Sequence, residues 1–267
     1  MKFQGKAALV TGGARGIGAA IVRHLASEGA DVAFTYATSD RSAEALIDAL
    51  TVHGGRLLGL KADSRDPTAI RHAVDQTAPG HGERLSADPT AIRHAVDQTA
   101  ETFGRLDILV NNAGVFPAGP IEDVSLQEID DTLAIHARAV FITSQAALSH
   151  MRAGGRIISI GSCFAQRVPY GGVTLYAMSK SALIGFTKGL AREVGERGVT
   201  VNIVDPGSTE TDMNPIDGPT VAAELELMAV KRYAQPAEIA AAVGFLAGEE
   251  SRFITGSSLA IDGGFAA

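Results

Sequence analysis

Short apolar runs alternate with longer segments that carry apolar residues at three- and four-residue spacing along most of the chain. The runs predict strands at residues 7–11, 31–36, 55–63, 106–114, 156–162 and 199–204, of which 106–114 continues into a polar, glycine-ended turn. The spaced segments predict helices at residues 19–28, 125–151 and 173–196. This alternation favours an α/β fold with a doubly wound parallel sheet and helices on both faces. Ligands of such a sheet bind at the carboxyl ends of the strands.

A glycine-rich turn separates the first predicted strand from the first predicted helix. Gly12, Gly13, Gly16 and Gly18 lie in this turn. Glycines allow the backbone to turn tightly and to approach a pyrophosphate, which then lies at the positive end of the helix. The pattern predicts a dinucleotide site, and the alternative is a glycine-rich connection without a ligand.

The residues after the second strand indicate which dinucleotide is preferred. The strand ends at Tyr36 without the acidic residue that would bind the ribose hydroxyls of NAD. Thr38, Ser39 and Arg41 follow, and Arg15 lies within the glycine turn. Hydroxyl and guanidinium groups suit a 2′-phosphate, so the sequence favours NADP(H).

Two polar residues near this site have an alternative role. Arg41 also fits a solvated charge at the start of a helix. Asp63 ends the third strand, where its carboxylate can accept a hydrogen bond from an adenine amino group. The alternative role of Asp63 is helix capping.

A tyrosine and a lysine in the helix at 173–196 are the candidates for proton transfer. Tyr176 and Lys180 are four residues apart, which places them on one helix face, and Ser162 ends the preceding strand. A free tyrosine titrates near pH ~10, so a neighbouring cation helps it to exchange protons with an alcohol or ketone. We expect Lys180 to lower the pKa of Tyr176. Taken alone, the pair also fits a surface contact worth ~0.2–0.5 kcal/mol.

Composition narrows the class of protein. The 267 residues, 46% of them hydrophobic, suit one domain with a large core. A net charge of −7 argues against a nucleic-acid polymer as partner. Cys163 is the single cysteine, so no intrachain disulfide is expected, and we interpret it as a packing residue. The start of the chain lacks a signal-peptide pattern and no apolar run reaches ~20 residues, so we expect a cytoplasmic protein that does not span a membrane. No metal site is predicted.

Residues 66–78 recur letter for letter 22 residues later, at 88–100. Each copy begins with Asp-Pro and can start a helix, although only one helix is needed between two strands. The second copy continues into an apolar stripe at helical spacing: Ile92, Val96, Thr99 and Phe103. We therefore predict that the second copy packs on the sheet, and that the first copy with the linker 79–87 forms a surface protrusion. Duplication of the 66–78 helix makes 79–100 an insertion.

Several motifs recur together in one order along the chain. They are Thr11-Gly12-x-x-x-Gly16-x-Gly18, Asn111-Asn112-Ala113-Gly114, Ser162, Tyr176-x-x-x-Lys180 and Asn202-x-Val204-x-Pro206-Gly207. Together they resemble the short-chain dehydrogenase/reductase family over almost the whole chain, with only the 22-residue repeat outside it. The resemblance also marks 253–264 as the last strand.

The resemblance implies a single Rossmann domain over residues 1–267 and a hydride transfer between nicotinamide C4 and a carbonyl carbon. It implies catalytic roles for Ser162, Tyr176 and Lys180, of which the first two stabilise the developing oxyanion and Lys180 also holds the nicotinamide ribose. It further implies cofactor contacts from Gly12, Arg15, Gly16, Ile17, Gly18, Asn112, Ala113, Gly114, Tyr176, Lys180, Pro206, Gly207, Thr209 and Thr211.

One position departs from the family pattern. The long fourth helix of the family carries an asparagine that helps to hold a water molecule linking the lysine to solvent, and the matching residue here is His136. A histidine can donate, accept and become charged near neutrality, so it is a candidate for the relay with a shifted pH profile. The alternative is a hydrogen-bonded core histidine.

Residues 208–231 correspond to the substrate-binding region of the family. The Asn-Pro-x-x-Gly-Pro run that begins at Asn214 resembles 3-oxoacyl carrier-protein reductases and also a bacterial cyclic-di-GMP-binding biofilm dispersal mediator. The favoured function is therefore an NADPH-dependent reductase of a ketone or 3-oxoacyl carbonyl. One alternative is a regulator that binds cyclic-di-GMP with little or no turnover, and another is an inactive scaffold disturbed by the insertion.

A second copy of the chain is the expected macromolecular partner. The helices that hold His136 and Tyr176 are apolar around much of their circumference, more than one sheet contact would cover. In the family such helices pair between subunits, so the resemblance implies a homotetramer, with a dimer as the smaller assembly.

Overall fold

The computed structural model describes residues 1–50, 55–65 and 91–267, and within them the strands form one seven-stranded sheet in the order β3-β2-β1-β4-β5-β6-β7. Each neighbouring pair of strands is parallel. The strands are β1 (Ala7–Val10), β2 (Asp31–Tyr36), β3 (Leu57–Lys61), β4 (Ile108–Asn111), β5 (Arg156–Ile160), β6 (Thr200–Pro206) and β7 (Ser258–Ile261). The predicted doubly wound parallel sheet is confirmed.

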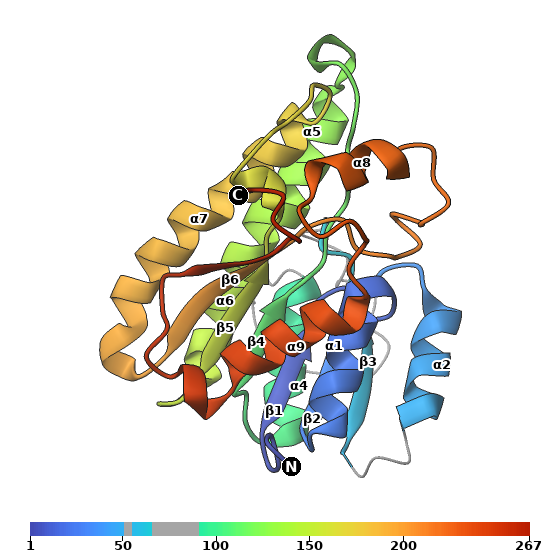
Figure 1. The fold of residues 1–267 in the computed structure, drawn as a ribbon. Helices are drawn as coiled ribbons and strands as arrows, with labels where there is room; N and C mark the ends of the chain where they lie inside the picture. The colour runs from blue at the N-terminus through green and yellow to red at the C-terminus, as the bar shows by residue number, and fades with distance from the viewer. Residues whose placement is uncertain (51–54, 66–90) are drawn as a thin grey trace.

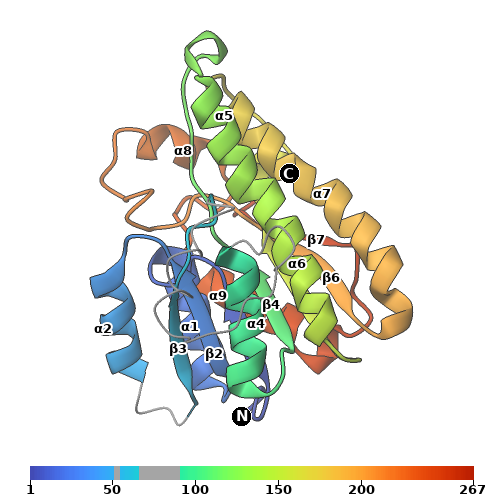
Figure 2. The same cartoon turned by 180° about the vertical axis from the view of Figure 1, so that it is seen from behind.

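Helices cover both faces of the sheet. They are α1 (Gly16–Ser27), α2 (Asp40–Leu50), α4 (Ala91–Phe103), α5 (Leu126–Leu133), α6 (Ala139–His150), α7 (Thr174–Val194), α8 (Val221–Leu227) and α9 (Pro236–Ala247). Helices α1, α2 and α9 lie on the face turned to the viewer in Figure 1, and α4, α6 and α7 lie on the opposite face in Figure 2.

Side-chain alternation along the strands builds a separate core on each face. Ala8 and Val10 of β1 belong to the cluster that packs against α1, α2 and α9. Ala7 and Leu9, the alternate residues, belong to the cluster that packs against α4, α6 and α7. Every residue of β1 is buried, because a parallel strand with helices on both sides has no solvent face.

Helix α9 is an element for which the sequence pattern above gives no prediction. It is apolar around most of its circumference, so it lacks the stripe that marks an amphipathic helix. It packs closely on α1: a Cβ atom added at Gly244 would lie 2.1 Å from Nε2 of His24. Burial of Ile239 and Leu246 stabilises the fold by ~1.5–3 kcal/mol for each side chain.

The predicted helix at 125–151 is interrupted. A capping box at Ser125 and Glu128 starts α5, and a π-helical turn at Ala134–Arg138 separates it from α6. Turns of this kind recur at functional sites, and this one contains the buried His136.

The second copy of the repeated segment provides α4. Its predicted stripe is buried in the structure: Ile92, Val96, Thr99 and Phe103 are each at most 8% exposed. The expected protrusion formed by the first copy and the linker 79–87 lies outside the described residues. Among the described helices, none is long and apolar enough to cross a membrane.

Candidate active site

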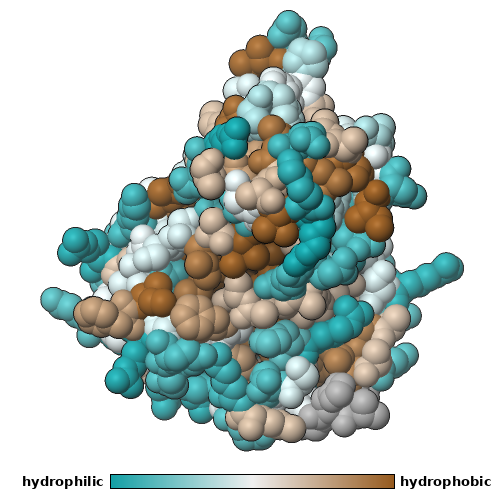
Figure 3. Space-filling model, in the orientation of Figure 1, coloured by the Kyte–Doolittle hydropathy of each residue, from teal (hydrophilic) through white to brown (hydrophobic). Residues whose placement is uncertain are grey.

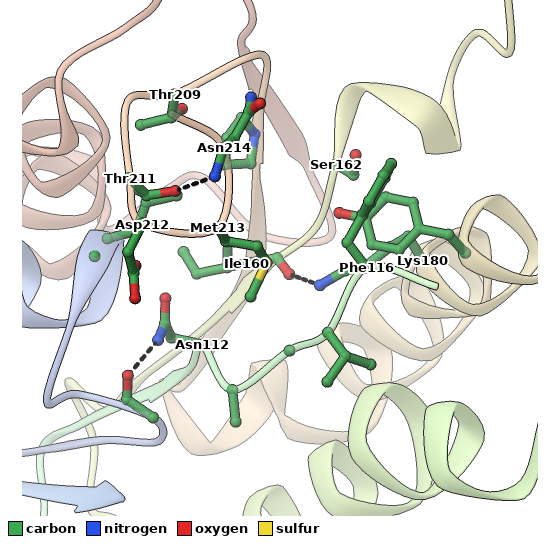
Figure 4. A pocket seen from close by; sticks show the side chains of 18 of the residues that line it. Asn112, Phe116, Ile160, Ser162, Lys180, Thr209, Thr211, Asp212, Met213 and Asn214 are labelled. Carbon is green, nitrogen blue, oxygen red and sulfur yellow. Dashed lines mark hydrogen bonds between the residues drawn. The ribbon is translucent and has the colours of Figure 1, made fainter. Parts of the chain in front are cut away.

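A pocket of about 1260 Å³ opens at the carboxyl ends of the strands, where the turns after β1 to β6 converge. In Figure 4 the loop that carries Thr209 to Asn214 forms one wall, and Ser162, Phe116 and Lys180 lie opposite it. Most of the residues predicted to form the site line this pocket: Gly12, Arg15, Gly16, Ile17, Gly18, Tyr36, Thr38, Ser39, Asp63, Asn112, Ala113, Gly114, Ser162, Tyr176, Lys180, Pro206, Gly207, Thr209 and Thr211.

Two predicted site residues do not line the pocket. Arg41 is exposed in the first turn of α2, which corresponds to the solvated helix-start charge given as its alternative. His136 is 1% exposed and lies behind the pocket wall.

The glycine turn forms a close-packed cradle at the start of α1. Gly12 has a φ of +63°, and a Cβ atom on Gly18 would lie 2.3 Å from the Gly12 carbonyl oxygen and 2.5 Å from Nδ2 of Asn112. Asn112 Nδ2 donates to the carbonyl oxygens of Thr11 and Gly12, at 3.0 Å each. Helix α1 has no acidic residue in its first turn. This shape and the positive helix end fit the pyrophosphate of a dinucleotide.

Ion pairs hold two arginines at the rim of the cradle. Arg15 pairs with Asp212 of the loop after β6, and Arg65 forms a two-point pair with Asp63 whose shortest distance is 2.7 Å. Arg65 holds the pKa of Asp63 below its usual value through these hydrogen bonds, although partial burial acts in the opposite direction. Asp63 therefore lines the pocket as predicted, but its carboxylate is paired with Arg65.

Two groups of opposite charge hold the end of β5, just before Ser162, which is predicted to be catalytic. Lys180 Nζ donates to the carbonyl oxygen of Ile160 at 2.9 Å, and Asp205 Oδ1 accepts the backbone N–H of Ser162 at 2.9 Å. Gly161 lies between them, and a Cβ atom there would be 1.9 Å from Asp205 Oδ1. Burial lowers the pKa of Lys180 to about 8, and the charge of Asp205 opposes this shift.

Tyr176 is half-buried among aromatic rings, and its pKa differs from the prediction. Burial raises the pKa of Tyr176 to about 12, and a hydrogen bond with Ser162 only partly offsets this. The negative charge of Asp205 raises it further. The expectation that Lys180 lowers this pKa is not supported, because the ammonium lies 5.9 Å from the ring centroid and is directed to Ile160. The phenol is therefore protonated at neutral pH.

Comparison with known proteins agrees with this geometry. A family model for the short chain dehydrogenases matches residues 6–85, and a model described as enoyl-(acyl carrier protein) reductase matches residues 86–266. The cyclic-di-GMP-binding biofilm dispersal mediator protein of Escherichia coli K12 is 40% identical over 265 residues, 99% of each chain. The 3-oxoacyl-[acyl-carrier-protein] reductase FabG of the same strain is 39% identical over 267 residues, 99% of this chain and 98% of that protein.

A crystal structure of a short chain dehydrogenase from Burkholderia cenocepacia J2315 in complex with NADP is also similar. It has a TM-score of 0.91 and 50% sequence identity, with 100% of both chains covered. The chain belongs to the short-chain dehydrogenase/reductase family.

His136 is the residue that we expect at the position of the family's asparagine, and its hydrogen bonds define its protonation state. The N–H of Val115 donates to Nε2 of His136 at 3.0 Å, so this nitrogen carries no proton. Nδ1 then donates to Ser179 Oγ at 2.8 Å, and Ser179 Oγ donates to the carbonyl oxygen of Tyr176 at 2.7 Å. Both ring nitrogens are used within the protein, which favours the core histidine over the relay.

Burial lowers the pKa of His136 to about 2, and the charge of Lys180 acts in the same direction. The expectation that His136 becomes charged near neutrality is therefore wrong. Burial likewise raises the pKa of the Cys163 thiol to about 12, consistent with a packing role.

Some functional residues were missed from the sequence alone. Asp205 is not part of a motif. The only sequence feature that marks it is a charged residue in an otherwise apolar run, between Val204 and Pro206. Arg65 lies two residues beyond Asp63, just before the repeated segment. The pocket aromatics Phe116 and Tyr170 lie in loops, where no periodicity indicates which way a side chain points.

We expect the neutral state of His136 to reduce stability in acid. The unfolded chain binds a proton at this residue below pH ~6.5 and the folded chain does not, so the free energy of unfolding falls as the pH falls. From pH 7 to pH 5, His136→Asn should lose about 2 kcal/mol less stability than the parent in urea denaturation. His94→Asn, at an exposed position of α4, is the control. Equal losses in the parent and His136→Asn would contradict the assignment.

We expect Asp205→Asn to separate the effect of the Asp205 charge from the effect of its hydrogen bond to Ser162. The amide oxygen of asparagine can still accept the Ser162 N–H, while the charge that raises the pKa values of Tyr176 and Lys180 is removed. The pH profile of kcat/KM for alcohol oxidation should shift to lower pH by about half a unit or more. Asp205→Ala also removes the hydrogen bond and should lower kcat by about tenfold. An unshifted profile in Asp205→Asn would rule out the charge effect.

Proposed function

We propose that this chain is an NADPH-dependent reductase that converts a ketone or 3-oxoacyl-type carbonyl to a secondary alcohol. The observation that carries the proposal is the convergence of Ser162, Tyr176 and Lys180 on the pocket that contains the glycine cradle. The protonated phenol of Tyr176 suits the reductive direction, in which the tyrosine gives up a proton.

NADP(H) is the cofactor that we propose for the cradle. The absence of side chains at Gly12 and Gly18 leaves room for a pyrophosphate at the start of α1, and Thr38, Ser39 and Arg65 line the same pocket. The similar short chain dehydrogenase from Burkholderia cenocepacia is in complex with NADP. When bound, the reduced nicotinamide supplies the hydride.

The residues of the chain supply the proton and the orientation. The carbonyl oxygen of the substrate receives hydrogen bonds from Ser162 Oγ and the Tyr176 hydroxyl, which stabilise the negative charge that develops there. Tyr176 then transfers its proton to this oxygen. Ser162 Oγ accepts the N–H of Phe164 at 3.2 Å, so its own proton is available to the phenol or the substrate. Lys180 donates to the Ile160 carbonyl oxygen and Asp205 accepts the Ser162 N–H, and these contacts keep Ser162 in place.

The reductase proposal competes with a regulatory function. The similarity to the cyclic-di-GMP-binding biofilm dispersal mediator, at 40% identity, is the observation behind this second candidate. A regulator of this kind would bind cyclic-di-GMP in the pocket without consuming NADPH. The intact Ser162, Tyr176 and Lys180 favour the reductase, because binding alone does not need a proton donor.

We expect Tyr176→Phe to lower carbonyl-dependent NADPH oxidation by ~10²-fold or more, because it removes the proton donor but leaves the ring in place. The affinity for NADPH, measured by fluorescence titration, should change less than about threefold. Ser251→Ala, which removes a buried hydroxyl outside the pocket lining, is the control. No oxidation by the parent with any carbonyl of a panel, together with tight cyclic-di-GMP binding, would favour the regulator instead.

We propose a homotetramer in which α6 and α7 take part in the subunit contacts. Phe141 is 58% exposed and its ring lies 5.7 Å from that of Phe186, so the two helices present an apolar pair to solvent in the single chain. Phe141→Glu should reduce the molar mass seen by light scattering to that of a dimer or monomer. Ala45→Glu on the exposed side of α2 adds the same charge elsewhere and should leave the mass unchanged. An unchanged mass in Phe141→Glu would exclude this contact.

A further inference from the structure

The substrate side of Tyr176 is walled by aromatic rings. The Phe116 ring meets the Tyr176 ring edge-on, with their centroids 4.7 Å apart. The centroids of the Phe164 and Tyr176 rings are 6.0 Å apart. Tyr170 packs edge-on against Phe164 at 5.5 Å. Phe116 and Tyr170 are 43% and 42% exposed, so apolar ring surface faces the open pocket. A ligand with an aromatic or bulky apolar group would cover this surface.

The opposite wall is also largely apolar. Met213, Pro215, Pro219 and Leu227 of the loop after β6 and of α8 line it. Hydrophobic side chains gather over this end of the molecule in the space-filling view (Figure 3). The two apolar walls enclose the position where Tyr176 would deliver its proton.

The charges at this end disfavour an anion. Of the described lysines and arginines that line the pocket, Arg15 and Arg65 lie on the cofactor side in ion pairs, and Lys180 is bonded to Ile160. Glu224 of α8 lines the substrate side. Among the described lining residues, an anionic substrate would therefore meet a carboxylate and no cation outside these contacts.

Hydrogen bonds keep Glu224 ionised and oriented. It accepts from Ser208 Oγ at 2.6 Å, Tyr233 Oη at 2.8 Å and Thr220 Oγ1 at 2.7 Å. Burial raises the pKa of Glu224, but these bonds together with one from Asn214 outweigh burial, so the pKa is lowered overall. The carboxylate also ties the loop after β6 to α8, which keeps the negative charge at a fixed position in the pocket wall.

We propose that the carbonyl substrate is an electroneutral ketone with an aromatic or bulky apolar group beside the carbonyl, and that Glu224 selects against anionic substrates. This rests on the proposed reductase function and names its substrate class. Of the two substrate classes in the proposed function, this proposal keeps the ketone and excludes a 3-oxoacyl thioester on an anionic phosphopantetheine arm.

A matched pair of substrates tests the charge selection. Ethyl benzoylformate and the benzoylformate anion share the phenyl ring and the ketone, and they differ in the charge beside it. We expect kcat/KM for NADPH oxidation to be at least about tenfold higher with the ester. In Glu224→Gln this ratio should fall to about threefold or less, mainly through a lower KM for the anion. Glu226→Gln, on the same helix but outside the pocket lining, should keep the parent ratio.

The aromatic wall and the excluded class are tested in the same assay. Phe116→Ala should raise KM for the ester by about tenfold with a smaller change in KM for a small aliphatic ketone such as butanone. Faster reduction of benzoylformate or acetoacetyl-CoA than of the ester would overturn the substrate class while leaving the reductase intact. An equal ratio in the parent and Glu224→Gln would overturn the role of Glu224. No oxidation with any of these carbonyls, despite NADPH binding, would instead count against the reductase itself.

Discussion

Two buried ions of opposite sign hold the end of β5, and the geometry of the site depends on them. Lys180 of α7 donates to the carbonyl oxygen of Ile160, and Asp205 of β6 accepts the N–H of Ser162. Lys180 is 5% exposed and Asp205 is 1% exposed, so both groups are held away from water. Gly161 completes the arrangement, because any side chain there would collide with the Asp205 carboxylate. The position of Ser162 is therefore set by two elements, α7 and β6, that are distant from it in the sequence.

Features that depend on local spacing were predictable. The range of β2 was predicted without error. Strands β1 and β5 begin at the predicted residue and end one and two residues earlier than predicted, and α7 begins one residue later and ends two residues earlier. The glycine turn was predicted because only glycine fits a φ of +63° at Gly12 and the close approach at Gly18. The alternation of these elements then determines the parallel sheet, and the parallel sheet brings the ends of its strands to one pocket.

Features that depend on tertiary contacts were not predictable in this way. Helix α9 has no apolar stripe because the exposed positions Ala237, Ala241 and Phe245 are apolar like its buried ones. The state of His136 is decided by the Val115 N–H and by Ser179, which lie 21 and 43 residues away in the chain. A sequence comparison assigns this residue a position, but only the partners of its two ring nitrogens show that it is neutral.

The same limit explains the error about Tyr176. A spacing of four correctly placed Lys180 beside the phenol, but the spacing says nothing about where the ammonium points. In the structure the ammonium donates its hydrogen bond to the Ile160 carbonyl oxygen, so burial dominates and the phenol keeps its proton. A proton donor with a raised pKa is protonated at neutral pH, and it transfers its proton only when a stronger base forms beside it. In the proposed reductase mechanism the oxyanion produced by hydride addition would be such a base, so the buried groups that orient Ser162 would also favour reduction.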